Sequence, residues 1–190
     1  MTEFVSHGRT TSFLAEVVSN EDDYNVPSYC YPGAETNAWV PGIAVRVTSA
    51  SGAEWLGRFM QGEESPNGVD LCCIHPDGQR LVVVARGSGY VVAPENPSRW
   101  EEVPIRPILG HCFDDSSNTL VLFDYTRAIG VNRNGATWKT RSLSWDGLVD
   151  VGIKDGALAG KGWDAALSKW VDFVVRLDDG SSSGGASPPD

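Results

Sequence analysis

Four short runs between Leu109 and Leu177 decide the fold: Asn118-Thr-Leu-Val-Leu-Phe-Asp124, Arg127-Ala-Ile-Gly-Val131, Asn134-Gly-Ala-Thr-Trp138 and Trp145-Asp-Gly-Leu148. Each run is short and apolar, and Gly, Asn or Asp stands at or beside its ends. β-Strands joined by tight turns have this pattern. The sequence therefore predicts an all-β fold in which similar units follow one another.

A repeat supports this prediction. Leu81-Val-Val-Val84 lies 39 positions before Leu120-Val-Leu-Phe123, and Trp100 lies 38 positions before Trp138. Each copy reads as a strand, a polar turn, a strongly apolar strand, a Gly-containing turn, a strand and a strand carrying Trp. A period near 40 with about four strands is typical of β-propeller blades, so we predict small or partial propeller-like antiparallel repeats. A β-sandwich is the alternative, because its strands alternate at similar spacing.

The repeat also predicts that Trp100 and Trp138 occupy equivalent, largely buried positions. The expected organisation is one all-β domain over residues 1–178, followed by a disordered low-complexity tail over 179–190. Within the domain we expect irregular N-terminal strands and loops over 12–68, and repeat units over 69–108, 109–148 and 149–178.

Expectations for the first half of the chain are less regular. Residues 1–11 read as loosely attached, and Asn20–Pro41 as a long irregular connection. Pro94–Pro97 reads as a loop, because its two prolines lack the backbone donors that a ladder needs. Clearer strands are predicted at Ser12–Val18 and in a hairpin of Ile43–Val47 with Glu54–Met60.

Composition narrows the classes of function. The chain has 190 residues, with 25 acidic and 15 basic side chains and a formal net charge of −10. This charge argues against binding to nucleic acid or to an anionic membrane, since both need a surplus of Lys and Arg. We see no secretory signal, and the longest apolar run, Leu81–Ala85, is far too short to span a bilayer. The expected location is the cytoplasm, with four reduced cysteines.

Two Cys–His pairs invite a metal-site hypothesis. Cys73 and His75 would share one strand face, and Cys112, the repeat equivalent of Cys73, adjoins His111. Neighbouring residues on a strand point to opposite faces, so at most three of these ligands can converge. We therefore predict small buried cysteines in a β-core, with no metal and no cofactor.

Asn134-Gly-Ala-Thr-Trp138 resembles the second half of the Asp-box turn of sialidase-like propellers. Val131 and Arg133 stand where that motif has Ser and Asp, so the match is partial. The resemblance implies a tight structural hairpin closed by a packed Trp, and no motif supports sialidase chemistry.

Trp145-Asp146 and Trp163-Asp164 recur 18 residues apart at expected strand ends. Asp commonly caps turns by accepting backbone hydrogen bonds; a paired-carboxylate acid–base site is the catalytic alternative. We assign no catalytic residue. A structural role is predicted for Trp55, Trp100, Trp138, Trp145, Asp146, Gly147, Trp163, Asp164 and Trp170.

The spacing of Leu143-Ser-Trp-Asp-Gly-Leu148, Gly162-Trp-Asp164 and Val171-Asp-Phe173, followed by Gly184-Gly185, resembles a group of uncharacterised bacterial β-repeat proteins. The resemblance covers roughly residues 69 to 186. It implies a bacterial cytosolic β-protein and no particular activity.

The first functional hypothesis is a non-enzymatic β-repeat module that binds another protein or a small ligand through loops on one face. The loops considered are Tyr24–Thr36, Gln61–Gly68 and Pro94–Ser98. The alternatives are a carbohydrate-acting hydrolase on a propeller scaffold, or an acidic immunity-type protein that neutralises a basic partner by charge complementarity. The sequence leaves the oligomeric state open.

Overall fold

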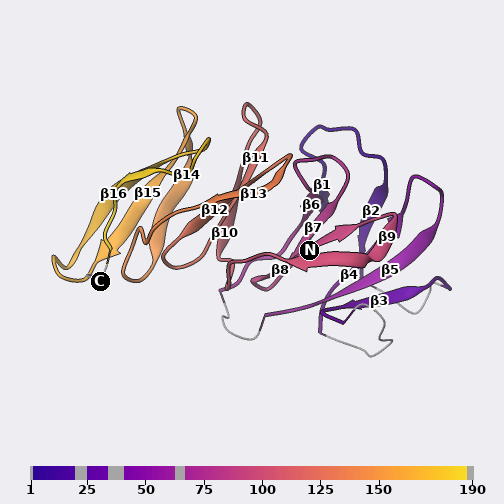
Figure 1. Cartoon of the computed structure of the whole chain (residues 1–190). Helices are drawn as coiled ribbons and strands as arrows, with labels where there is room; N and C mark the ends of the chain where they lie inside the picture. Colours follow the sequence, from indigo (N-terminus) through magenta and orange to yellow (C-terminus); the bar gives the residue numbers. More distant parts are fainter. Residues whose placement is uncertain (1, 20–24, 34–40, 63–66, 188–190) are drawn as a thin grey trace. The chain divides into compact units, whose positions relative to one another are not determined.

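A computed structural model describes residues 2–19, 25–33, 41–62 and 67–187 of the chain. Within these ranges the protein has seventeen β-strands and no helix (Figure 1), so the described residues contain no helix that could cross a membrane. The strands form four small, largely antiparallel sheets. The predicted all-β class, built from small propeller-like antiparallel repeats, is confirmed.

The chain divides into two compact units, residues 1–108 and 109–190. Unit 1 holds two sheets. The first has the order β2-β4-β5-β3, and the second has the order β1-β6-β7-β8-β9. Their bounds are β1 Phe4–Val5, β2 Leu14–Val18, β3 Ser28–Tyr31, β4 Gly42–Thr48, β5 Glu54–Met60, β6 Leu71–Ile74, β7 Leu81–Ala85, β8 Ser88–Ala93 and β9 Asn96–Glu102.

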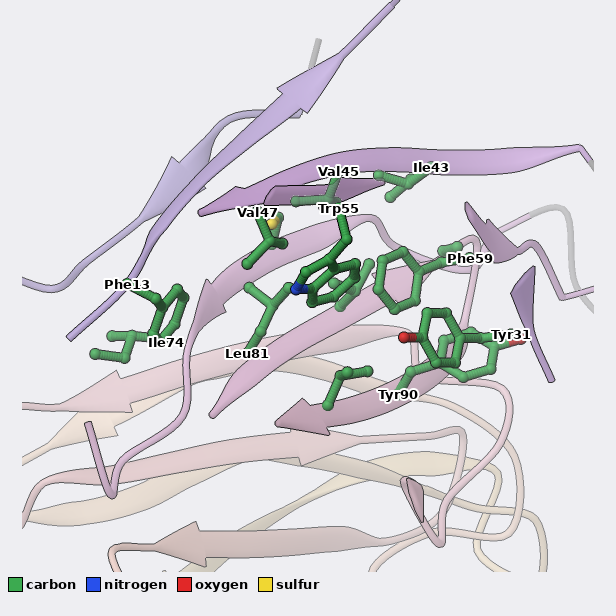
Figure 2. Close-up of a cluster of buried hydrophobic side chains, with 14 residues drawn as sticks. Phe13, Tyr31, Ile43, Val45, Val47, Trp55, Phe59, Ile74, Leu81 and Tyr90 are labelled. Carbon is green, nitrogen blue, oxygen red and sulfur yellow. The ribbon is translucent and has the colours of Figure 1, made fainter. Parts of the chain in front are cut away.

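The core of unit 1 lies between these two sheets (Figure 2). Alternate residues of β4 enter it, as the period-two pattern predicts, and Tyr31 stacks on Phe59 with ring centroids 4.7 Å apart. Two buried tyrosines keep a polar partner: the Tyr31 hydroxyl donates to the Pro97 carbonyl at 2.9 Å, and the Tyr90 hydroxyl donates to the Met60 carbonyl at 2.8 Å. Both rings can therefore pack in the core while their hydroxyl groups keep a hydrogen bond.

Unit 2 is more regular. Two four-stranded antiparallel sheets follow one another along the chain, each with its strands in sequence order (Figure 1). Their bounds are β10 Gly110–Asp114, β11 Thr119–Phe123, β12 Ala128–Asn132, β13 Gly135–Lys139, β14 Leu148–Lys154, β15 Ala157–Asp164, β16 Lys169–Arg176 and β17 Ser182–Gly184.

The two sheets of unit 2 share one buried cluster. Val121 and Trp138 from the β10–β13 sheet pack with Leu158, Phe173 and Val175 from the β14–β17 sheet. The indole Nε1 of Trp138 donates to the Leu177 carbonyl at 2.7 Å, so its polar atom is satisfied inside the core. The predicted structural hairpin closed by a packed Trp is therefore present.

The predicted equivalence of Trp100 and Trp138 is confirmed by strand register. Trp100 of β9 pairs with Val92, and Trp138 of β13 pairs with Gly130, in each case just before a β-bulge in the partner strand. Burial differs, however, since Trp138 is 8% exposed whereas Trp100 is only half-buried.

Three predictions for irregular segments were wrong. Residues 1–11 are not loosely attached, because β1 pairs in parallel with β6 through Phe4↔Cys72. The described part of Asn20–Pro41 contains β3, which pairs in parallel with β5. β9 begins at Asn96 and includes Pro97; an edge strand tolerates proline because one side of its backbone needs no partner.

The predicted tail and third repeat also need correction. Within residues 179–187, β17 pairs with β16, and Arg141 donates to the Gly184 carbonyl at 2.9 Å, so this part is ordered despite its low complexity. The last sheet therefore extends past residue 178. Its fourth strand carries no Trp; Trp163 and Trp170 lie on its second and third strands.

Candidate functional site

The two Trp-Asp motifs of the sequence meet at one end of the β14–β17 sheet. The Ser144 hydroxyl donates to the Gly147 carbonyl at 2.6 Å and accepts the Trp163 backbone N–H at 2.8 Å. The Trp145 N–H donates to the Trp163 carbonyl at 3.0 Å. Ser144 is fully buried, and its hydroxyl group joins the Ser-Trp-Asp-Gly turn to the strand that carries the Gly-Trp-Asp motif.

Two glycines of these motifs are required by the local packing. A Cβ on Gly162 would collide with the Leu143 carbonyl oxygen, so only Gly lets the strand approach this closely. Gly147 has φ of +93°, which side-chain-bearing residues rarely adopt, and its Cβ position faces the Trp170 ring at 3.7 Å. The backbone beneath Trp170 is consequently fixed by hydrogen bonds and by steric fit.

Trp163 and Trp170 form an aromatic pair on the outer face of this sheet. They are opposite each other in the β15–β16 ladder, and their rings meet edge to face with centroids 5.3 Å apart. Side chains alternate between faces along a strand, so Trp170, Asp172, Val174 and Arg176 share the outer face. We call Trp163, Trp170 and Val174, with Leu167 in the adjoining turn, the tryptophan face.

The tryptophan face is unusually exposed for its composition. Trp170 and Val174 are each 44% exposed and Leu167 is 60% exposed, whereas Phe173 between them is 1% exposed in the core. Exposed Trp, Leu and Val side chains gathered on one rigid face mark an interaction surface more often than isolated exposed residues do. The described structure gives the Trp170 indole N–H no protein partner, in contrast to that of Trp138.

Charged side chains border the apolar positions. Lys161, opposite Asp172 in the ladder, donates to Asp150 at 2.8 Å. This hydrogen bond, with the attraction between the two charges, lowers the pKa of Asp150 and raises that of Lys161. A hollow of about 180 Å³, lined partly by Ala159, Lys161, Asp172 and Val174, lies beside the ion pair. The face thus combines apolar contact area with fixed charges.

The predicted structural residues fall into two groups. Trp55 is buried in the core of unit 1, where its indole N–H donates to the Pro94 carbonyl at 2.9 Å. Trp138 is buried in unit 2, and Trp100 and Trp145 are half-buried. The side chains of Trp163 and Trp170 instead lie on the outer face of the β14–β17 sheet. Asp146 and Asp164 lie at the turns beside them.

The local geometry does not support the alternative in which Asp146 and Asp164 form an acid–base pair. The Asp164 carboxylate accepts the Leu167 N–H at 3.0 Å and so caps the β15–β16 turn. The Asp146 side chain is exposed in the Ser144 turn. The turn-capping interpretation holds for Asp164.

The four residues of the metal hypothesis lie in different units, Cys73 and His75 in unit 1 and His111 and Cys112 in unit 2. In the described part of the chain, no group of three or more His, Cys, Asp or Glu side chains is placed to hold a metal ion. All four cysteines are free thiols, and burial raises the pKa of Cys73 to about 12. Burial is also the main cause of the raised pKa of Cys72.

The loops that sequence reasoning considered for binding contribute little to this site. Tyr24, the segment 34–36 and residues 63–66 lie outside the described residues, and Pro94–Ser98 leads into β9. Sequence reasoning treated Trp170 as purely structural. The alternation of Trp170 with Asp172 and Arg176, across the strand from Phe173 and Val175, was the signal that it faces outward.

Comparison with known proteins leaves the chain without a family. No family model matches it, and no curated protein matches its sequence. Among solved structures, it is similar to BamB from Moraxella catarrhalis, with 17% identity and a TM-score of 0.38 over 60% of this chain and 34% of that chain.

It is also similar to the N-terminal domain of Nup159, with 11% identity and a TM-score of 0.43 over 99% of this chain and 54% of that one. A chain in an S. cerevisiae complex of Dbp5 with Nup159 and Gle1 matches at 13% identity and a TM-score of 0.43, over 98% of this chain and 54% of that chain. This chain therefore spans between 34% and 54% of the length of the structures it matches. At these TM-scores the likeness does not bear on function.

Proposed function

We propose that the protein is a non-enzymatic binding module whose tryptophan face docks another protein, and that the partner presents a basic surface. One observation carries the proposal: Trp170 and Val174, each 44% exposed, lie on the same face of a strand whose other face is core, with Asp172 between them. Trp is the residue type most enriched among the positions that dominate the energy of protein interfaces. The Ser144 hydrogen bonds hold the adjoining Trp163 backbone in place before binding, which reduces the entropy lost on association.

Charge supports a basic partner. The net charge of −10 attracts cationic proteins over long distances and repels acidic ones. At contact, the face of an exposed indole attracts an Arg or Lys side chain through its π electrons. Asp172, two residues from Trp170 on the same strand face, adds a carboxylate beside that position.

The alternative of a carbohydrate-acting hydrolase would need two carboxylates facing a substrate cleft. The exposed apolar residues here are Trp170, Val174 and Leu167, and the carboxylate of Asp164 caps a turn. Such a surface suits docking better than acid–base chemistry.

The test is a comparative affinity capture from a cell extract with three purified proteins: the unaltered chain, Trp170→Ala and Leu14→Ala. Leu14 is the matched control, because it is 72% exposed on β2 of unit 1, whereas the tryptophan face belongs to unit 2. We expect one or a few basic proteins to be retained by the unaltered chain and by Leu14→Ala, but lost with Trp170→Ala. Raising the salt from about 50 mM to about 200 mM should weaken retention, because screening reduces the long-range attraction.

Three outcomes would contradict the proposal. The first is retention of the same proteins by Trp170→Ala, and the second is capture of acidic proteins whose binding ignores salt. The third is self-association of the purified chain that Trp170→Ala abolishes, which would assign the face to a second copy of this protein.

A further inference from the structure

A second, separate pocket lies within unit 1. It has a volume of about 440 Å³, with Val91 and Ala93 of β8 among its lining. One side is the β6–β7 turn with Asp77, Gln79 and Arg80, and the other side is the edge strand β9 from Arg99 to Glu101. The volume falls within the usual range for small-molecule sites.

Arg80 is held in place across this pocket by three partners. Its Nε donates to Asp77 Oδ2 at 2.6 Å, and its Nη1 donates to Glu101 Oε1 at 2.7 Å, which ties the turn to β9. Its Nη2 lies 3.1 Å from Nε2 of His75, a residue only 1% exposed. Nδ1 of His75 lies 3.1 Å both from Asp77 Oδ1 and from the Asp77 backbone N, so His75 contacts Asp77 as well as Arg80.

Asp77 is equally constrained. It accepts the backbone N–H groups of Gln79 and Arg80 at 2.8 and 3.0 Å. Burial alone would raise the pKa of Asp77, but hydrogen bonds from His75, the Gln79 N–H and Arg80 outweigh it and hold the pKa well below its usual range. A carboxyl that stays ionised has no proton to give, so Asp77 cannot serve as a general acid.

The groups left for a ligand are both donors and acceptors. Arg99 makes no hydrogen bond or ion pair with the described residues, the side-chain amide of Gln79 is likewise available, and Glu101 keeps its second oxygen. The charges of Asp77, Arg80, Arg99 and Glu101 cancel, so the lining does not favour a strongly ionic ligand. Trp100, between Arg99 and Glu101 on β9, instead points to the core side of the sheet, where its ring packs edge to face on Tyr31 with centroids 5.7 Å apart.

We propose that this pocket binds a neutral saccharide unit. Sugar hydroxyls donate and accept hydrogen bonds at once, which matches the mixed set offered by Arg99, Gln79 and Glu101. The apolar C–H face of a sugar ring suits the aliphatic lining of Val91 and Ala93. This site is independent of the tryptophan face in unit 2 and goes beyond the protein-binding function proposed there.

The test is calorimetric titration of the full chain with methyl glycosides of glucose, galactose, mannose and N-acetylglucosamine, with glucuronate and inorganic phosphate as anionic probes. We expect saturable binding of at least one neutral glycoside with a Kd in the millimolar range, as for a few neutral hydrogen bonds. Arg99→Ala and Gln79→Ala should each weaken that binding about 10-fold, and both positions are exposed, so the fold should survive.

Trp170→Ala serves as the control variant and should bind the glycoside as the unaltered chain does. This separates the saccharide site from the tryptophan face, because either can fail without the other. The proposal is overturned if none of the neutral glycosides binds, if binding persists unchanged in Arg99→Ala, or if only glucuronate or phosphate binds.

Discussion

The two faces of β16 carry similar aromatic and aliphatic residues, but one face is buried and the other is exposed. Phe173 and Val175 are 1% and 0% exposed in the core of unit 2, whereas Trp170 and Val174 on the other face are each 44% exposed. A strand buried on one side normally carries polar residues on the other. The departure from that rule at Trp170 and Val174 is the reason why we propose that the outer face contacts a partner.

The largest expected effect of a substitution is on the inner face. Phe173→Ala should lower the free energy of unfolding by about 3–5 kcal/mol, because it removes a large ring from a packed cluster and leaves a cavity. Trp138→Ala should cost a similar amount, since its ring lies in the same cluster. Urea unfolding followed by circular dichroism measures both, and a loss below about 1 kcal/mol would show that the cluster is loosely packed.

The contrast between enclosed and exposed groups extends to ion pairs. Asp77, enclosed with His75 and Arg80, has a lowered pKa, so its contribution to stability is present above the unfolded-state value of about 4. That contribution is lost as the pH falls towards the lower folded-state pKa. Asp77→Asn should cost about 1–3 kcal/mol at neutral pH and less in acid, because part of the charge-dependent contribution is already lost there.

Thermal or urea unfolding near neutral pH and at about pH 3 checks this linkage. The control is Asp150→Asn, which removes the exposed partner of Lys161 and should leave stability unchanged at both pH values. An equal loss for Asp77→Asn at both pH values would assign its role to shape rather than charge.

On the outer face, Trp170→Ala should change the free energy of unfolding by no more than about 1 kcal/mol, since surface substitutions leave the core intact. Phe173→Ala is the matched comparison, because both substitutions remove an aromatic ring from β16 and the two positions are three residues apart. Destabilisation as large as that of Phe173→Ala would mean that Trp170 is a core residue.

The smallest effect concerns the thiols. Burial raises the pKa values of Cys72, Cys73 and Cys112, which keeps them protonated and slow to react, but Cys112 alone among them is half-buried. Titration with a thiol reagent at mildly alkaline pH should modify Cys112 first and the buried cysteines only on unfolding. Equal rates for all would show that unit 1 opens readily.

Much of the fold could be predicted because its strands carry strong local signals. Apolar runs such as Leu81–Ala85 and turn residues such as Asp77-Gly78 fix strand and turn positions, and the 38-residue spacing placed Trp100 and Trp138 in register. The parallel pairings of β1 and β3 could not be found this way, because they depend on partners distant in sequence. β17, rich in Ser and Gly, has no intrinsic strand signal and is ordered by β16 and Arg141.

The candidate sites were harder to predict for the same reason. The Ser144 contacts with Trp163 join motifs that the sequence showed only as a repeat of Trp-Asp, and the exposure of Trp170 depends on which face the core takes. The pocket around Arg80 needs the β6–β7 turn and β9 to come together across the sheet. Neither residue spacing nor composition reports such a contact.

The measurement that tests the central claim most directly is the affinity of the captured basic partner for the unaltered chain and for Trp170→Ala, by calorimetry in one buffer. If the tryptophan face is the docking surface, the substitution should weaken binding by about 30-fold or more, the effect expected of a central interface Trp. An unchanged Kd, with Trp170→Ala still folded, would contradict the assignment of this face.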